Sequence, residues 1–248
     1  MNLESALALQ SKVILMELFQ ATDGQNWQVS KNWDSKAPLS TWYGVEVDGS
    51  GNVIELRLQS NNLKGPIPLC LGQLKKLAVL YLPYNQLVGP IPECLGELTK
   101  LTTLNLNSNM LEGPIPPCLS RLRYLSRLDL NTNQLTGPIP ECLSGLTWLT
   151  ILSLHSNKLE KDIPPSLGRL VHLVMLWLNN NQLTGPIPTS LGGLTDLTLL
   201  ELSNNKLKGR IPTCLGQLPN LTYLWIHNNQ YNGPIPQALQ RFNIRLQD

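Results

Sequence analysis

Histidine and cysteine are the residues of this chain most suited to metal binding or nucleophilic chemistry, and their spacing limits what they can do. Three histidines and five cysteines occur in 248 residues. The histidines are His155, His172 and His227, and the first and last are 72 residues apart. The cysteines are Cys70, Cys94, Cys118, Cys142 and Cys214, separated by 24 residues or a multiple of 24. No zinc-binding, phosphate-binding or serine-nucleophile motif accompanies them.

Asparagine and proline show the same period of 24 residues. The asparagines are Asn61, Asn85, Asn109, Asn133, Asn157, Asn181, Asn205 and Asn229. The prolines are Pro68, Pro92, Pro116, Pro140, Pro164, Pro188, Pro212 and Pro236. Eight units therefore run from 53 to 244, with the pattern L-x-x-L-x-L-x-x-N-x-L-x-G-P-I-P-x-x-L-G-x-L.

Each unit predicts one coil of chain. The L-x-L alternation has a period of two, which indicates a short strand with its leucines facing inward. The G-P-I-P segment predicts a turn that continues neither a helix nor a central strand, because proline lacks an amide donor and fixes its own φ angle. The closing L-G-x-L is long enough for one helical turn only. A single coil cannot bury its leucines, so we expect stacked coils around one core, with the asparagines in an internal hydrogen-bonded ladder.

Stacking restricts the chemistry of the histidines and cysteines. His155 and His227 occupy one repeat position three coils apart, about 14 Å at the spacing of strands, which is too far to share a metal ion. His172 falls on another face. The cysteines share one repeat position with two serines and an alanine, so we expect small, packed, free thiols. The sequence predicts no catalytic site, no metal site and no cofactor.

Charge and hydropathy exclude further classes of partner. The net charge is +2 and the basic residues are scattered, so no basic face is available for nucleic acid. No window approaches the roughly 18 uncharged apolar residues of a bilayer span, and we expect neither a signal peptide nor a transmembrane helix. We also expect a monomer.

The repeats resemble the plant-type, 24-residue leucine-rich repeats, whose mark is the G-x-I-P segment. The head carries A-T-D-G-Q-N-W ending at Trp27, N-W at Trp33 and P-L-S-T-W-Y-G from Pro38. It resembles the amino-terminal cap of algal, protist and bacterial members, including Roco-type GTPases. The resemblance implies an α/β solenoid, a right-handed, curved coil with a parallel β-sheet on its concave face and turns or short 3-10 helices on its convex side. We expect one structural domain, with a helical and hairpin cap at 1–52, eight repeats at 53–244 and a tail at 245–248.

The predicted cap must cover the leucines of the first coil. Trp27, Trp33 and Trp42 are half of the six tryptophans, and we expect them to form its core against an amphipathic stretch that contains Ile14. The segment from Asp48 to Asn52 has some likeness to a calcium loop, but it lies between two alternating runs and predicts a hairpin turn.

Recognition by a solenoid is expected on the outward positions of its strands. Large apolar groups collect there in units five to eight, residues 149–244, and such surfaces mark protein or peptide partners. Glu201 lies between Trp177 and Trp225 in this pattern, where it would add polar selectivity. The predicted binding residues are Tyr81, Tyr84, Arg127, Asp129, Ile151, His155, Met175, Trp177, Leu199, Glu201, Tyr223, Trp225 and His227.

Two features lie off this face. Tyr124, Trp148 and His172 stand at the position before each strand, and we expect them to stack on successive coils as a secondary lateral patch. Lys161 and Asp162 replace the usual glycine and proline of unit five. We expect the glycine conformation to be abandoned there, with a local change in the turn or a dent on that flank.

The sequence thus predicts a non-catalytic recognition module that binds a protein or peptide through its concave face. The predicted cap contains no cysteine, and the thiols of the repeats are expected to be unpaired. Both features favour a reducing, cytoplasmic compartment, in which the chain would be the sensor part of a larger, Roco-like protein. The alternative is an extracellular receptor ectodomain or a secreted hydrolase inhibitor, as among plant-type relatives. A third possibility is ice or glycan binding by the Asn- and Ser-rich columns, which lack the strict regularity that a crystal surface demands.

Overall fold

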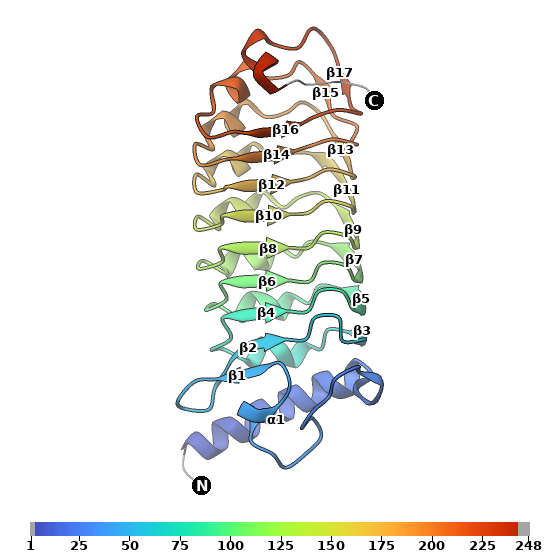
Figure 1. The fold of residues 1–248 in the computed structure, drawn as a ribbon, viewed down its shortest axis with the longest axis vertical. Helices are drawn as coiled ribbons and strands as arrows, with labels where there is room; N and C mark the ends of the chain where they lie inside the picture. Colours follow the sequence, from blue (N-terminus) through green and yellow to red (C-terminus); the bar gives the residue numbers. More distant parts are fainter. Residues whose placement is uncertain (1–2, 243–248) are drawn as a thin grey trace.

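The computed structural model describes residues 3–242, and for residues 3–8 the backbone alone. The chain forms a stack of coils, with helix α1 (Leu3–Ala21) lying across the amino-terminal end (Figure 1). The predicted tail at 245–248 lies outside the described residues. The division into cap, repeats and tail stays a prediction.

One long sheet runs the length of the stack. Its order is β1-β2-β4-β6-β8-β10-β12-β14-β16, and every neighbouring pair is parallel except β1 and β2. Its strands are β1 (Val45–Val47), β2 (Val53–Arg57), β4 (Val79–Tyr81), β6 (Thr103–Asn105), β8 (Arg127–Asp129), β10 (Ile151–Ser153), β12 (Met175–Trp177), β14 (Leu199–Glu201) and β16 (Tyr223–Trp225). From β2 onward, residues 24 apart lie side by side, as in the pairing of Leu104 with Leu128. The expected parallel sheet is confirmed.

Short 3-10 helices lie where the L-G-x-L segments predict single helical turns. The seven helices η3 to η9 each begin directly after the proline that ends the turn, which is extended and acts as N-cap. The 3-10 helices are η1 (Gly24–Asn26), η2 (Leu39–Thr41), η3 (Leu69–Gln73), η4 (Glu93–Glu97), η5 (Pro117–Arg121), η6 (Glu141–Gly145), η7 (Pro165–Arg169), η8 (Thr189–Gly193), η9 (Thr213–Gln217) and η10 (Gln237–Phe242). The α/β solenoid with short 3-10 helices is therefore confirmed.

A second parallel sheet corrects the prediction that each G-P-I-P segment forms only a turn. The strands are β3 (Lys64–Pro66), β5 (Gln86–Pro90), β7 (Met110–Pro114), β9 (Gln134–Gly137), β11 (Lys158–Asp162) and β13 (Gln182–Thr184), with a separate pair β15 (Lys208–Gly209) and β17 (Gln230–Tyr231). Pro66, Pro90 and Pro114 each end a strand. Proline has no N–H to donate, but at the end of a strand this leaves the hydrogen bonds in the interior of the sheet intact.

The core is a continuous column of leucine and isoleucine. In a typical coil Leu104, Leu106 and Leu111 are completely buried, and each buried leucine contributes about 1.5–3 kcal/mol relative to exposure. At the amino-terminal end the column is closed by aromatic rings, since Trp27 and Trp33 meet edge-on at 4.8 Å between ring centroids. The tryptophan core predicted for the head of the chain is confirmed.

The segment from Asp48 to Asn52 is a hairpin turn, as predicted. It joins β1 to β2, which pair in antiparallel fashion. The Oδ1 atom of Asp48 accepts hydrogen bonds from the backbone N of Ser50 at 2.9 Å and of Asn52 at 3.0 Å. The side-chain hydrogen bond from Asn52 is the main cause that lowers the pKa of Asp48. The carboxylate therefore closes its own turn.

The asparagine ladder is also confirmed. Asn157 shows the pattern, since its Nδ2 atom donates to Leu130 O on the preceding coil at 3.0 Å and to Leu154 O on its own coil at 3.1 Å. Its Oδ1 atom accepts from the backbone N of Leu135 at 3.0 Å. Because each amide uses both its donor and acceptor on backbone groups, neighbouring coils are held in a common register.

Unit five differs from the prediction at Lys161. The glycine conformation is kept, because Lys161 has a φ of 69°, between the values of 73° at Gly137 and 67° at Gly185. Two neighbouring parallel strands pair with β11 on either side and impose the same backbone path. The expected dent is present as an open hollow of about 600 Å³, lined in part by Pro140, Lys161 and Asp162.

Candidate ligand-binding face

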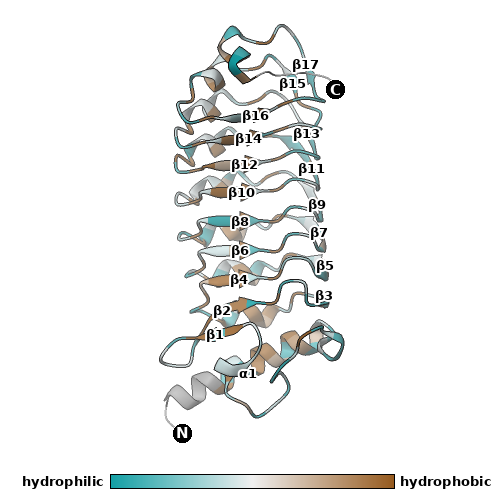
Figure 2. Cartoon of the chain, in the orientation of Figure 1, coloured by the Kyte–Doolittle hydropathy of each residue, from teal (hydrophilic) through white to brown (hydrophobic). Residues whose placement is uncertain are grey.

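The long sheet presents two rows of outward side chains. From β4 to β16 the middle residue of each strand is a buried leucine, so the first and third residues point away from the core. Strand register places Ile151, Met175, Leu199 and Tyr223 in one row across β10 to β16. The same register places Ser153, Trp177, Glu201 and Trp225 in the next row. Figure 2 shows the resulting contrast, with hydrophobic colour on β10, β12 and β14 and hydrophilic colour on β8.

The six large apolar residues of these rows form what we call the aromatic patch, made of Ile151, Met175, Trp177, Leu199, Tyr223 and Trp225. Tyr223 and Trp225 stack with 5.5 Å between ring centroids and 18° between ring planes. They are 53% and 39% exposed, and the other four members are half-buried. The structure thus brings together six of the predicted binding residues on four neighbouring strands.

Glu201 stands inside the aromatic patch. It is paired in register with Trp177 on one side and Trp225 on the other. Its Oε1 atom accepts a hydrogen bond of 3.1 Å from the backbone N of Ser203 and another from the Ser203 hydroxyl. Ser203 is buried, so the carboxylate is held by a fixed partner. Sequence reasoning missed this role of Ser203, although its spacing of two from Glu201 places both on one face.

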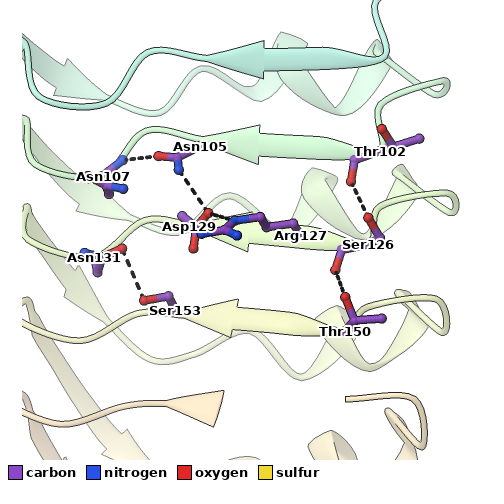
Figure 3. Close-up of polar contacts among 9 residues, drawn as sticks. All are labelled: Thr102, Asn105, Asn107, Ser126, Arg127, Asp129, Asn131, Thr150 and Ser153. Atoms are coloured by element: carbon purple, nitrogen blue, oxygen red, sulfur yellow. Dashed lines mark hydrogen bonds and ion pairs between the residues drawn. The ribbon is translucent and has the colours of Figure 1, made fainter. Parts of the chain in front are cut away.

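A polar network occupies the face next to the patch, on β6 and β8 (Figure 3). The Oδ2 atom of Asp129 accepts hydrogen bonds from Arg127 Nε and, at 3.0 Å, from Asn105 Nδ2. Asp129 is 2% exposed. Burial raises the pKa of Asp129, and the hydrogen bond and charge of Arg127 oppose that shift. Asp129 therefore offers no exposed carboxylate to a ligand, and this end of the face presents the Arg127 side chain.

His155 follows β10, on the coil that carries Ile151 of the patch. It is half-buried, and its Nδ1 atom is 3.1 Å from Ser156 Oγ. Burial lowers the pKa of His155, and the charge of Asp129 partly opposes the shift. His227 occupies the same repeat position three coils away. Within residues 3–242, no group of three or more histidine, cysteine or acidic side chains is arranged to hold a metal ion.

Tyr81 and Tyr84 are separated from the patch. Tyr81 lies on β4, where the guanidinium of Arg57 stands 5.6 Å from its ring centroid. Tyr84 follows that strand and is 62% exposed. The predicted site is therefore divided into a pair of tyrosines near the amino-terminal end, the ion pair of Arg127 and Asp129 on β8, and the patch on β10 to β16.

The lateral patch is only partly a stack. Trp148 and His172 stack with 5.9 Å between ring centroids, and His172 Nδ1 lies 3.3 Å from Asp196 Oδ2. Tyr124 does not join them, and its ring instead faces the ammonium of Lys100 at 5.5 Å. An open hollow of about 590 Å³ lies against Tyr124 and Trp148. The prediction of a continuous stack of three rings is wrong, because Trp148 stacks on His172 whereas the ring of Tyr124 is covered by the Lys100 ammonium.

The cysteine position is a hydrogen-bonding position. All five thiols are free. Cys118 Sγ donates to Glu93 O at 3.0 Å, and Ser166 Oγ and Ser190 Oγ make the equivalent bonds in their coils. Burial raises the pKa of Cys70 to about 12. The raised pKa fits a structural role for the Cys70 thiol, since a nucleophilic cysteine needs a lowered pKa.

Comparison with known proteins identifies the family. Leucine rich repeat models match residues 51–111 and 171–230, and further leucine rich repeat matches cover 124–146, 148–170 and 220–242. No helix of residues 3–242 combines the length and apolar character that crossing a membrane requires.

Solved structures are similar over most of the chain. The ectodomain of the receptor kinase GASSHO1/SCHENGEN3 from Arabidopsis thaliana, in complex with CASPARIAN STRIP INTEGRITY FACTOR 2, is 35% identical with a TM-score of 0.82, over 94% of this chain and 31% of that one. PEPR1 in complex with AtPEP1 is 36% identical with a TM-score of 0.83, over 91% of this chain and 32% of that one. A plant ice-binding protein is 29% identical with a TM-score of 0.72, over 94% and 91%.

The chain spans about a third of the length of the first two structures. These similarities support the plant-type repeat and a ligand-binding module, and they favour the extracellular alternative over the cytoplasmic one. They do not test the resemblance to Roco-type GTPases. The chain belongs to the leucine-rich repeat proteins, and its repeats are of the plant type.

Proposed function

We propose that this chain is a non-catalytic, monomeric, extracellular recognition module that binds a peptide or a peptide-like segment of a protein across β10 to β16. The observation that carries the proposal is the aromatic patch, six large apolar side chains in register on four strands. An exposed apolar surface of this kind marks an interaction site, and tryptophan and tyrosine are its usual energetic anchors.

The similar receptor structures support the extracellular version of this function. GASSHO1/SCHENGEN3 is an ectodomain solved with CASPARIAN STRIP INTEGRITY FACTOR 2, and HAESA was solved with the peptide hormone IDA. By analogy, this chain would be the peptide-binding portion of a receptor or a secreted binding protein. The similar structures named above give no such support to the cytoplasmic, Roco-like version.

The test is selection of binders from a display library of random linear peptides. Peptides enriched on the unaltered protein should lose at least about tenfold in affinity when Trp177→Ala and Trp225→Ala are combined, because each truncation removes an anchor. The matched control is Tyr124→Ala with Trp148→Ala, which removes two exposed aromatic rings off the sheet face. Equal loss in both double variants, or no loss in the first, would refute binding at the patch.

Ice binding is a second candidate, and one observation favours it. The plant ice-binding protein is similar over nearly the full length of both chains. The outward residues after the strands are largely Asn, Ser and Thr, but Pro83, Tyr84 and His155 interrupt them. Inhibition of ice recrystallisation, measured on the same variants, separates the candidates. Activity that survives loss of both tryptophans would favour ice binding by the polar columns.

A further inference from the structure

Glu201 differs from the other acidic side chains on this face of the parallel strands β2 to β16. Glu55 on β2 is paired with Arg57 Nε at 2.6 Å, and Asp129 on β8 is paired with Arg127. In each case the arginine is two residues away on the same strand. Glu201 forms no ion pair within residues 3–242, and its hydrogen-bond partner is the neutral Ser203.

The surroundings of Glu201 are apolar and aromatic. Trp177 and Trp225 flank it in register, one strand away on each side. Neighbouring strands are about 4.8 Å apart, so a cation at the carboxylate would lie within the roughly 6 Å over which it is attracted to an indole ring. The half-buried carboxylate of Glu201 has lost part of its hydration, and no basic side chain within residues 3–242 forms an ion pair with it in return.

The charge of the patch is complementary to a cation. Among the outward residues of β10, β12, β14 and β16, Glu201 is the single one that carries a formal charge, and no lysine or arginine stands in either row. The patch thus presents one carboxylate between two indole rings, and no basic residue on these four strands is available to pair with it.

We propose that Glu201, Trp177 and Trp225 form a recognition site for a cationic side chain, an arginine or a lysine, of the bound peptide. This inference rests on the proposed function, since it names the chemistry of the ligand at the patch. Arginine is the better fit of the two, because its planar guanidinium can stack on an indole while its edge donates to the carboxylate.

A small probe tests the site without any selected ligand. N-acetylarginine amide is titrated against the protein while the indole N–H signals of the six tryptophans are followed by NMR, with N-acetylcitrulline amide as a neutral probe of similar shape. We expect the signals of Trp177 and Trp225 to shift with arginine and not with citrulline, while the signals of the buried Trp27, Trp33 and Trp42 stay in place. Equal shifts with citrulline, or no shift with arginine, overturn the proposal.

The variant Glu201→Gln separates charge from shape. Glutamine keeps an oxygen that accepts from Ser203, so the fold and the melting temperature should be unchanged. We expect arginine binding to weaken about tenfold, as loss of an ion pair beside aromatic rings implies. Glu160→Gln, which removes an exposed carboxylate on β11 of the other sheet, is the matched control and should bind normally. Equal binding by Glu201→Gln and the unaltered protein overturns the proposal.

Peptide selection distinguishes failure of this inference from failure of the proposed function. If selected peptides need the two tryptophans but contain no enriched arginine or lysine and bind Glu201→Gln equally, the cation site is refuted and peptide binding stands. If they are indifferent to the tryptophans, peptide binding at the patch is refuted, and the amide probes still decide the site. Both the cation site and peptide binding are supported if the selected peptides are enriched in arginine or lysine and if replacing that residue by citrulline or norleucine weakens binding to the unaltered protein but not to Glu201→Gln.

Discussion

The Nδ2 atom of Asn133 donates a hydrogen bond of 3.0 Å to the main-chain oxygen of Leu106, which lies one coil earlier. The same atom also donates to Leu130 O and Asn131 O, and Asn133 Oδ1 accepts from Leu111 N. One side chain therefore satisfies backbone groups of two coils. Stability depends on such amides, because an unpaired buried backbone group is costly.

Replacement Asn133→Ala should lower the free energy of unfolding by about 3 kcal/mol, since it leaves several buried backbone groups without a partner. Chemical denaturation followed by circular dichroism measures the loss. Gln134→Ala, at the exposed neighbouring position, should change stability by less than about 0.5 kcal/mol. Equal stability of the two variants would contradict the ladder.

The cysteine position should accept serine more readily than valine. A serine at position 118 can keep the hydrogen bond to Glu93 O, because Ser166 and Ser190 donate equivalent hydrogen bonds to Glu141 O and Pro165 O in their own coils. Cys118→Val removes the donor, and we expect it to be less stable than the serine variant by about 1 kcal/mol. Thermal melting of both variants gives the comparison. A valine variant as stable as the serine variant would show that only size matters here.

All five thiols should be free in solution, as they are in the structure. Titration with a thiol reagent in denaturant, without reductant, should find five, whereas the native protein should react more slowly because burial raises the pKa of Cys70, Cys94 and Cys118. A count below five that recovers after reduction would reveal disulfides between neighbouring coils.

Lys161→Gly should stabilise the protein. Lys161 holds a φ of 69°, where a side chain is strained and glycine is not. The free energy gained by relieving this strain is larger than the free-energy cost of the extra entropy that glycine gives the unfolded chain. We therefore expect the free energy of unfolding to rise by about 0.5–1 kcal/mol. The reciprocal change Gly137→Ala, at a φ of 73°, should destabilise. A loss of stability in Lys161→Gly would mean that the lysine side chain outweighs its backbone strain.

His155 should make the protein less stable in mild acid. Burial lowers the pKa of His155 below its ordinary value of 6.5, so the folded state binds a proton less tightly than the unfolded chain. The stability that the neutral imidazole contributes is present above about pH 6.5 and is lost as the pH falls through the lowered pKa.

The control for this effect is His155→Asn, because Asn131 and Asn179 occupy the equivalent position in the two neighbouring coils. Free energies of unfolding measured from about pH 7 to about pH 5 should fall more steeply for the unaltered protein than for the variant. Parallel curves would show that His155 titrates normally.

Much of the fold follows from the period alone. A leucine at Leu104 and another at Leu128 have identical neighbours in the sequence pattern, so both must face inward once the coils stack. The asparagine ladder is equally predictable, because an amide repeated at every turn finds the same backbone partners in each coil. The patch on β10 to β16 was also accessible, since outward positions can be read from a strand period of two.

The second sheet and the backbone conformation of Lys161 could not be predicted from the repeat pattern. Proline and glycine predict a turn from local chemistry, whereas pairing between β5 and β7 depends on how closely consecutive coils approach. Lys161 keeps the glycine conformation because β9 and β13 on either side direct the backbone, and this constraint lies in other coils.

What the sequence by itself determined is therefore everything that repeats, namely the coil, the inward leucines, the asparagine ladder and the rows of outward residues. What only the tertiary structure decided is everything specific to one coil, such as the burial of Asp129 beside Arg127, the stack of Tyr223 on Trp225 and the hydrogen bonds that Glu201 accepts from Ser203. The physical reason is that a periodic pattern repeats the same contact in every coil, whereas these contacts depend on which unlike side chains meet and how their rotamers pack.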